Sequence, residues 1–121
     1  MNTTQGKAVG AFAALTTMAR RITSNFTAYK LFKLKKALQD VVDFQSEQEQ
    51  KLVTELGGTV TETGMIVLED KNKAEYSRKH KELEAMECEI DWKPVVMYIK
   101  ELPDISVAEI EALDEFIDWK E

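Results

Sequence analysis

TAYKLFKLKKALQDVVDFQSEQEQKLVTEL, residues 27–56, is the stretch that decides the fold. It contains no Gly or Pro and is rich in Leu, Lys, Gln and Glu, which lose little rotamer freedom in a helix. Thr27 is suited to the N-cap position, and Gly57-Gly58 supplies a C-terminal stop. The sequence therefore predicts one long helix, about 43 Å in length at about 1.5 Å per residue.

The apolar residues of this helix are unevenly distributed. Leu31, Leu34, Leu38 and Val41 form a seam in the first half, at spacings of three and four residues. The segment 45–51 (QSEQEQK) then contains no apolar residue at all. A small domain is about 30 Å across, so the second half should project beyond its own core. Because projecting helices commonly pair with another copy or another protein, we expect a homo-oligomer.

The charge of the chain changes sign within the long helix. Residues 1–36 contain seven Lys or Arg residues and no acid, whereas residues 37–121 contain nine basic and twenty-two acidic residues, for a net charge of −6. Such asymmetry indicates an anionic partner for the basic segment. The alternative is that the two segments neutralise each other within the fold or across an oligomer interface. The sequence supports both interpretations equally.

The rest of the chain mixes short helices with short strands. With residues 1–6 frayed, the spacing of apolar residues and the turn signals predict, in chain order, a helix over 7–23, a hairpin over 59–68, a surface helix over 71–86, strands over 88–92 and 95–99, and a last helix over 107–119. Ser106-x-x-Glu109 is a capping box for that last helix. We expect a single domain, 1–121, of the α+β class. It should be mainly helical, with one long projecting helix, two or three shorter helices and a small antiparallel sheet or hairpin.

The sequence contains no motif of a catalytic or metal site. It has no Walker loop, GxGxxG, GxSxG or HExxH. Cys88 lies between two glutamates, which disfavour the reactive thiolate. His80, the only histidine, is flanked by lysines and should be a solvated surface residue. One His and one Cys cannot form a zinc site of the usual type. We therefore expect no enzyme activity, no catalytic residue, no metal and no cofactor.

Membrane insertion and a disulfide framework are also disfavoured. No stretch reaches the roughly 20 apolar residues that a membrane-spanning helix needs. The chain has one cysteine, which suits a reducing compartment. We therefore expect a cytoplasmic protein without a membrane partner.

The basic start of the long helix is the candidate binding site. Lys33 lies four residues after Tyr29, so the two share a helix face. The helix N-terminus adds free N–H groups and a positive dipole end. These features predict a site for a phosphate-bearing ligand or an acidic protein surface; the alternative is a solvated face, or one paired with the acidic C-terminal helix. Duplex nucleic acid is disfavoured because the acidic remainder would repel it. The expected site residues are Tyr29, Lys30, Lys33, Lys36, Arg20 and Arg21.

Four motifs follow one another along the chain. They are AYKLFKLKKAL at 28–38, ExExKL at 47–52, KELEAMECEID at 81–91 and ISVAEIEALDEFI at 105–117. Their order resembles a family of small uncharacterised proteins of tailed bacteriophages and prophages. In that family a lysine-rich helix runs into an acidic hairpin, and the chain ends in S-x-x-E-(L/I)-x-x-L-x-x-(F/M)-I. Tyr29-x-x-x-Lys33 matches the family's S-Y-x-x-x-K element, with Ala28 in place of the usual small polar residue.

The resemblance implies a phage accessory protein inside the bacterial host cell. Combined with the basic segment and the lack of catalytic motifs, it leads us to expect a non-enzymatic factor that acts by binding. We expect a host-interaction or counter-defence factor that sequesters a nucleotide signalling molecule or an acidic protein partner. The alternative is a virion or tail-assembly factor that makes helix-mediated protein contacts.

Overall fold

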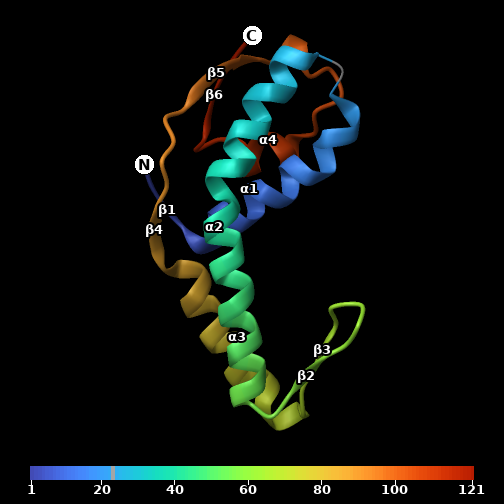
Figure 1. Cartoon of the computed structure of the whole chain (residues 1–121), viewed down its shortest axis with the longest axis vertical. Coiled ribbons are helices and arrows are strands. Elements are labelled where there is room, and N and C mark those ends of the chain that lie inside the picture. The colour runs from blue at the N-terminus through green and yellow to red at the C-terminus, as the bar shows by residue number, and fades with distance from the viewer. Residues whose placement is uncertain (23) are drawn as a thin grey trace.

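The computed structural model describes residues 1–22 and 24–121 and shows a mainly helical α+β fold with one long helix, as the sequence predicts (Figure 1). Thr23, part of the expected break between the first two helices, lies outside the described residues. The elements are β1 (Asn2–Thr4), α1 (Gln5–Met18), the 3-10 turn η1 (Ala19–Arg21), α2 (Asn25–Glu55), β2 (Thr59–Val60), β3 (Ile66–Val67), α3 (Asp70–Ala85), β4 (Glu87–Glu89), β5 (Val95–Tyr98), the 3-10 turn η2 (Ile99–Glu101), α4 (Val107–Leu113) and β6 (Ile117–Lys120).

Helix α2 is 31 residues long and begins earlier than predicted. Its N-cap is Ser24, whose hydroxyl accepts a hydrogen bond from the backbone N–H of Thr27. The prediction that Thr27 caps the helix was therefore wrong. Thr27 is instead buried, and its hydroxyl donates to Glu101 Oε2 at 3.2 Å. Because the Ser24 hydroxyl accepts from the backbone N–H of Thr27, the Thr27 side chain is not needed as a cap and is available for a tertiary contact.

The first half of α2 belongs to the body of the molecule. The predicted seam of Leu31, Leu34, Leu38 and Val41 is buried there, which confirms this prediction. The seam packs on α1 and on the C-terminal segments, and together they form one apolar core. The core residues outside α2 are Ala8, Ala11, Leu15, Met18, Ile90, Met97, Leu102, Leu113, Phe116 and Ile117.

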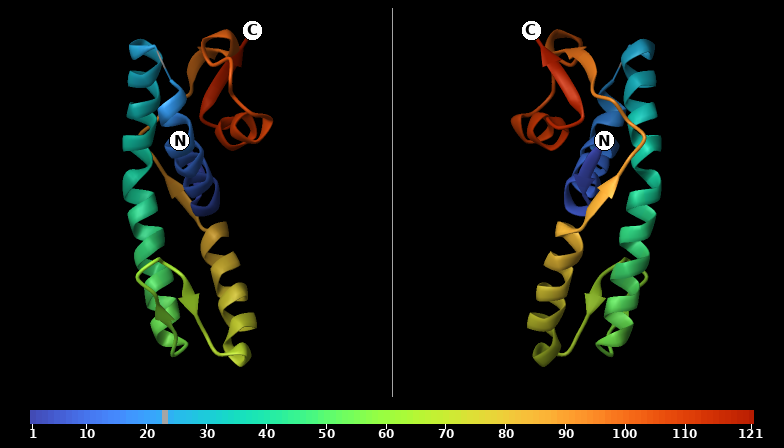
Figure 2. Two further views of the ribbon diagram at one scale, coloured as in Figure 1. Left: turned by 90° about the vertical axis from the view of Figure 1, so that its right-hand side faces the viewer. Right: turned by 90° about the vertical axis from the view of Figure 1, so that its left-hand side faces the viewer.

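The second half of α2 leaves the body and forms an arm. It projects as predicted, but α3 returns along it as an antiparallel neighbour (Figures 1 and 2). Leu52 and Val53 of α2 and Leu83 of α3 are the buried apolar residues of this arm. The hairpin β2–β3 lies at its far end, in the predicted segment, with Thr59 opposite Val67 and Val60 opposite Ile66.

The N-terminus is a strand rather than a frayed end, which corrects the prediction for residues 1–6. Strand β1 pairs antiparallel with β4, and the terminal amino group of Met1 donates to the Ile90 carbonyl at 2.7 Å. The segment has no local strand signal because its hydrogen-bonding partner lies near the other end of the chain. Tertiary pairing therefore determines its conformation.

The last helix is shorter than predicted. The capping box of Ser106 and Glu109 is present, but α4 ends at Leu113 rather than at residue 119. Residues Ile117–Lys120 form β6, which pairs in parallel with β5, so this pair also departs from the predicted antiparallel arrangement. Pairing with β5 satisfies the backbone groups of β6 while Ile117 enters the core, and the chain therefore leaves the helix.

Candidate functional site

The predicted binding residues Tyr29, Lys33 and Lys36 are exposed on the side of α2 that faces away from the core, and Lys30 lies half-buried at the flank of that side. Three aromatic rings lie there among the lysines: Phe26, Tyr29 and Phe32 are 67%, 57% and 59% exposed. Such exposure is unusual for large apolar side chains gathered within two turns of one helix. We call this surface the lysine–aromatic face; it consists of Phe26, Tyr29, Lys30, Phe32, Lys33 and Lys36.

Two of these lysines lie over aromatic rings of the same face. Lys30 Nζ is 4.4 Å from the centroid of the Phe26 ring, and Lys33 Nζ is 5.4 Å from that of Tyr29. Lys30 also donates to the carbonyl of Val96 in β5 at 3.4 Å. Cation–π contacts of this kind hold an ammonium group beside apolar surface without neutralising its charge. The face therefore presents positive charge and ring surface together.

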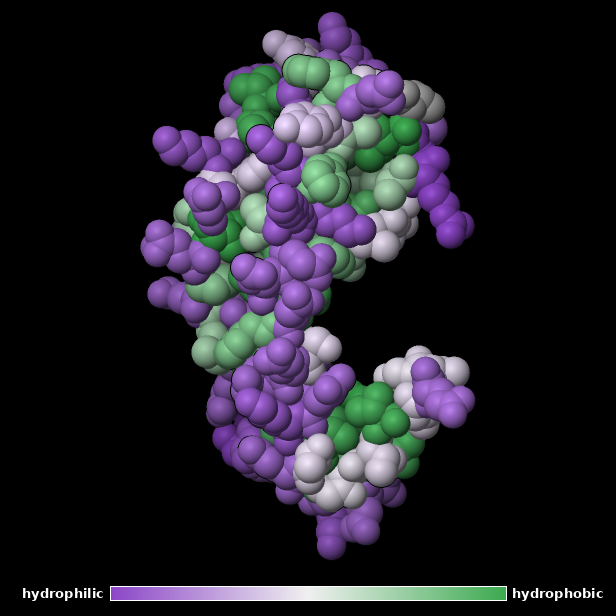
Figure 3. Space-filling model, viewed as in Figure 1, coloured by the Kyte–Doolittle hydropathy of each residue, from purple (hydrophilic) through white to green (hydrophobic). Residues whose placement is uncertain are grey.

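The apolar surface continues from α2 onto β5. Val96 and Tyr98 are 42% and 41% exposed, and Lys100 Nζ lies 5.4 Å from the Tyr98 ring. Figure 3 shows apolar and hydrophilic side chains interleaved over the upper part of α2, and mainly hydrophilic ones over its lower part. The exposed apolar surface of the body is thus concentrated around the start of α2.

The lysines of this face have no acidic partners within the described chain. No ion pair there involves Lys30, Lys33 or Lys36, whereas Lys7 pairs with Glu115 at 3.5 Å and Arg21 pairs with Glu109. Mutual neutralisation of the basic and acidic segments, the alternative raised by the sequence, therefore holds for Lys7 and Arg21. The charges on α2 remain available to an outside partner.

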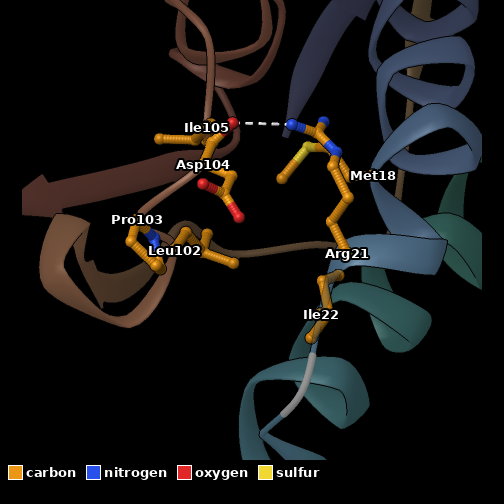
Figure 4. A pocket seen from close by; sticks show the side chains of 7 residues that line it. All are labelled: Met18, Arg21, Ile22, Leu102, Pro103, Asp104 and Ile105. Carbon is orange, nitrogen blue, oxygen red and sulfur yellow. Dashed lines mark hydrogen bonds between the residues drawn. The ribbon is translucent and has the colours of Figure 1, made fainter.

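The two predicted arginines do not join the lysine–aromatic face. Arg20 is exposed on η1. Arg21 points toward the C-terminal segments, where it donates to the Asp104 carbonyl at 2.6 Å (Figure 4). It also donates to the Glu109 carboxylate. It borders a cavity of about 20 Å³, lined also by Met18 and Leu102, which holds little more than one water molecule. Arg21 also borders a surface hollow of about 450 Å³, lined by Thr17 and Ala108 among others, but its guanidinium is held by the contacts to Asp104 and Glu109.

The carboxylate of Glu109 is tuned by this contact. Its burial acts to raise the pKa, but hydrogen bonds from the Ser106 backbone and from Arg21 outweigh burial and hold the pKa of Glu109 below its usual value. Glu109 therefore stays ionised at neutral pH and fastens α4 to η1 of the N-terminal segment.

His80 is not the solvated surface residue that the sequence predicts. Its Nε2 lies 2.7 Å from Glu49 Oε2 on α2, and its Nδ1 lies 2.9 Å from Glu84 Oε1 on α3. The ring also stacks on Tyr76 at a centroid distance of 5.5 Å. Burial, followed by the charges of the two glutamates, raises the pKa of Tyr76. His80 therefore joins the two helices of the arm.

Cys88 has neither the exposure nor the electrostatics of a nucleophile. It lies on β4, half-buried, and burial followed by the charge of Glu115 raises the pKa of its thiol. From the sequence, the adjacent glutamates were expected to disfavour the thiolate. In the structure, burial and the carboxylate of Glu115, which is distant in the sequence, raise the thiol pKa instead. Throughout residues 1–22 and 24–121, no group of three or more His, Cys, Asp or Glu side chains is arranged to hold a metal ion.

The sequence identified the lysines of the face and Tyr29 but not the other two rings. A signal was available: the buried seam of Leu31, Leu34 and Leu38 defines the inward side of α2, and Phe32 falls on the opposite side at 3.6 residues per turn. Phe26 becomes part of the helix only because Ser24, rather than Thr27, caps it.

Comparisons with known proteins add no further identification. None of the helices in the described part of the chain combines the length and apolarity needed to cross a membrane. The surface that carries function must therefore be inferred from its own chemistry, because no protein-family model, curated protein or solved structure matches this chain.

Proposed function

We propose that this protein is non-enzymatic and acts by binding, and that its lysine–aromatic face holds an acidic surface of a protein partner. One observation carries the proposal. On the outward side of α2, three rings that are more than half exposed lie among lysines that have no carboxylate partner in the described chain. Rings supply large contact area at low conformational cost, and aromatic residues are enriched in protein interfaces.

The shape of the face favours a macromolecular partner over a small ligand. It lies on the outer side of a helix, and such a surface fits into a groove of another protein. Small-molecule sites are concave, whereas the two hollows beside Arg21, of about 20 and 450 Å³, are lined by no residue of the lysine–aromatic face. Sequestration of a nucleotide signalling molecule, the other ligand suggested by the sequence, therefore has weaker support. The counter-defence role and the phage origin rest on the family resemblance alone.

The test is a titration with a defined acidic probe. Isotope-labelled protein is mixed with a synthetic peptide of alternating Glu and Leu blocks, and backbone NMR shifts are followed. We expect the largest shifts at residues 26–36. The double variant Lys33→Glu with Lys36→Glu should weaken binding about tenfold or more, because two attractive contacts become repulsive.

A matched control separates this face from general charge. Lys71→Glu with Lys73→Glu makes the same charge change on exposed residues of α3, far along the arm. This control should change the affinity by less than about twofold, since exposed charges beyond a Debye length are screened. If the test variant and this control lose the same amount of peptide affinity, or if neither loses any, the lysine–aromatic face is not the binding surface.

Two further measurements distinguish the alternative functions. Native mass spectrometry with a panel of nucleoside phosphates tests sequestration; recovery of unaltered nucleotide after denaturation marks a sponge rather than a hydrolase. If the wild type binds a nucleotide but not the peptide, and Lys33→Glu abolishes nucleotide binding, the ligand of the face is a nucleotide and not a protein. Incorporation of the labelled protein into purified virions would instead support the virion or tail-assembly role.

A further inference from the structure

The outward side of α2 carries a continuous stripe that extends beyond the lysine–aromatic face. Its residues follow one another at alternating spacings of four and three, which is the spacing of a helix-pairing seam. All of them are exposed. In chain order the stripe consists of Tyr29, Lys33, Lys36, Asp40, Asp43 and Glu47.

The charge of this stripe reverses at its middle. The side chains before residue 38 are cationic or aromatic, and those after it are anionic. Lys36 and Asp40 are equidistant from the level of residue 38, and so are Lys33 and Asp43. Reversing the direction of the helix therefore exchanges positive and negative positions, which makes the stripe complementary to itself in the antiparallel sense.

The anionic half of the stripe is as free as the cationic half. Within the described chain, Asp40, Asp43 and Glu47 make no ion pair with any Lys, Arg or His; Asp43 accepts one hydrogen bond, from the Gln39 side chain at 2.9 Å. Helix α2 also forms one edge of the molecule in both views of Figure 2, down to the level where the hairpin overlaps its lower part. The body, α3 and the hairpin thus leave the outward side of α2 accessible.

We propose that a second copy of this chain binds the outward side of α2 in antiparallel orientation, with the two-fold axis near the level of residue 38. Lys36 of each copy then lies near Asp40 of the other, and Lys33 near Asp43. Phe32 and the 38% exposed Phe44 flank the stripe and are covered as well. The contact is isologous, so it closes as a dimer and does not extend into a filament.

The charges select this arrangement over the parallel one. In a parallel pair Lys33 and Lys36 would meet their own copies, as would Asp40 and Asp43, and like charges repel. Exposed ion pairs individually contribute little to association, so the rings that become covered are needed for affinity. Electrostatics determines the orientation, and the aromatic side chains supply most of the buried apolar surface.

The dimer regulates the proposed binding function, and this part of the inference rests on that function. The acidic second half of α2 from one copy occupies the lysine–aromatic face of the other. An acidic partner must displace it, so self-association and partner binding compete for one surface. The free face would then be exposed mainly at low protein concentration or when a stronger partner is present.

Charge reversal provides the decisive test. Lys33→Asp with Lys36→Asp makes every charged position of the stripe anionic, and Asp40→Lys with Asp43→Lys leaves Glu47 as its one anionic position. Sedimentation should give twice the chain mass for the wild type, and the mass of a single chain for each variant alone. An equal mixture of the two variants should again give a dimer, containing one of each. Lys71→Asp with Lys73→Asp, off the stripe, should dimerise as the wild type does.

The opposite results would overturn the dimer. A wild type that stays monomeric at about 100 µM in low salt, where charge contacts are least screened, contradicts it. So do reversed variants that dimerise normally, or folded variants that fail to associate when mixed; circular dichroism verifies their folding.

A neutral variant separates failure of the dimer from failure of the proposed function. Asp40→Asn with Asp43→Asn keeps the whole lysine–aromatic face but removes the competing acids. If both proposals hold, this variant is monomeric and binds the acidic peptide more tightly than the wild type. The apparent Kd should fall in proportion to the fraction of wild-type chains whose face is free of the second copy. Equal peptide binding by both proteins refutes only the competition. If the variant is monomeric but does not bind the peptide, only the proposed function is refuted.

Discussion

Glu109 shows how one side chain can serve the helix it starts and the contact that holds the fold together. Its carboxylate accepts from the backbone N–H of Ser106, completing the capping box, and also from Arg21 in η1. Burial alone would favour the neutral acid, yet the donors around it lower its pKa. Because the carboxylate is stabilised in the folded state, protonation must weaken the fold.

We therefore predict that Glu109 makes stability depend on acid pH. A carboxyl whose folded pKa is depressed contributes stability that is fully present above its ordinary pKa and is lost as pH falls through the folded value. Urea unfolding between about pH 5 and pH 2 should show this loss in the wild type. Glu109→Gln should be less stable by about 1–2 kcal/mol at neutral pH, discounted for the partial exposure of Arg21, and should flatten the acid limb. Glu111→Gln, on the exposed side of α4, should leave that limb unchanged; a wild-type slope in Glu109→Gln would contradict the assignment.

At the scale of elements, α2 changes neighbours halfway along its length. Its first half contributes a seam of four apolar residues to the core of the body, whereas its second half buries Leu52 and Val53 and contacts α3 through Glu49 and His80. Asn72 donates to the free carbonyl of Leu56 at 2.8 Å, and His80 reaches a glutamate on each helix. Directed polar contacts therefore align the arm, where little apolar surface is available to do so.

We predict that the side chain of His80 makes the main stabilising contact between α2 and α3 in the arm. A ring that faces a carboxylate at both nitrogens can donate to both only when both nitrogens carry a proton. His80→Ala should lose both contacts and the stacking on Tyr76, and lower local stability by about 1–2 kcal/mol. Hydrogen exchange should accelerate in residues 70–85 and in the second half of α2, and remain unchanged in α1. Lys81→Ala, an exposed neighbour, serves as the control. If hydrogen exchange instead accelerates equally along the whole chain, the contacts of His80 do not stabilise the arm alone.

At the scale of the whole molecule, the protein consists of a body with a shared core and an arm with few buried residues. The body contains all fourteen residues of the main apolar cluster, whereas the arm buries Leu52, Val53 and Leu83. The free lysines and the exposed rings lie on the body, and the anionic half of the α2 stripe extends onto the arm. On the outward side of α2 the sign of the charge thus reverses along the long axis, which would give the proposed second copy a defined orientation.

This division predicts two levels of stability. Local opening is easiest where few apolar contacts must be broken. Native-state hydrogen exchange should therefore show α3 and the hairpin exchanging through an opening of lower free energy than α1 and the first half of α2. The difference should be several-fold to more than tenfold in protection factor, and it should narrow at protein concentrations that favour the dimer. Equal protection in α1 and α3 would mean that the arm and the body unfold as one unit.

The sequence by itself determined the features that depend on near neighbours in the chain. Composition and the Gly57-Gly58 stop determine α2, the three- and four-residue spacing determines the seam of Leu31 to Val41, and Ser106 with Glu109 determines the start of α4. The lysines and Tyr29 of the candidate site could also be read locally, since residues four apart on a helix share a face.

Only the tertiary structure decided the features that depend on distant residues. Strands β1 and β6 have no strand pattern strong enough to override a frayed end or a continuing helix, and each forms by pairing with β4 or β5, which lie in the predicted strand segments. Arg21 and Lys30 carry the same charge in the sequence, yet Arg21 meets the Glu109 carboxylate, whereas Lys30 lies over the Phe26 ring and donates to the Val96 carbonyl. Packing therefore decides which basic side chains stay available, because a carboxylate from 88 residues away reaches Arg21, whereas no ion pair within residues 1–22 and 24–121 involves Lys30, Lys33 or Lys36.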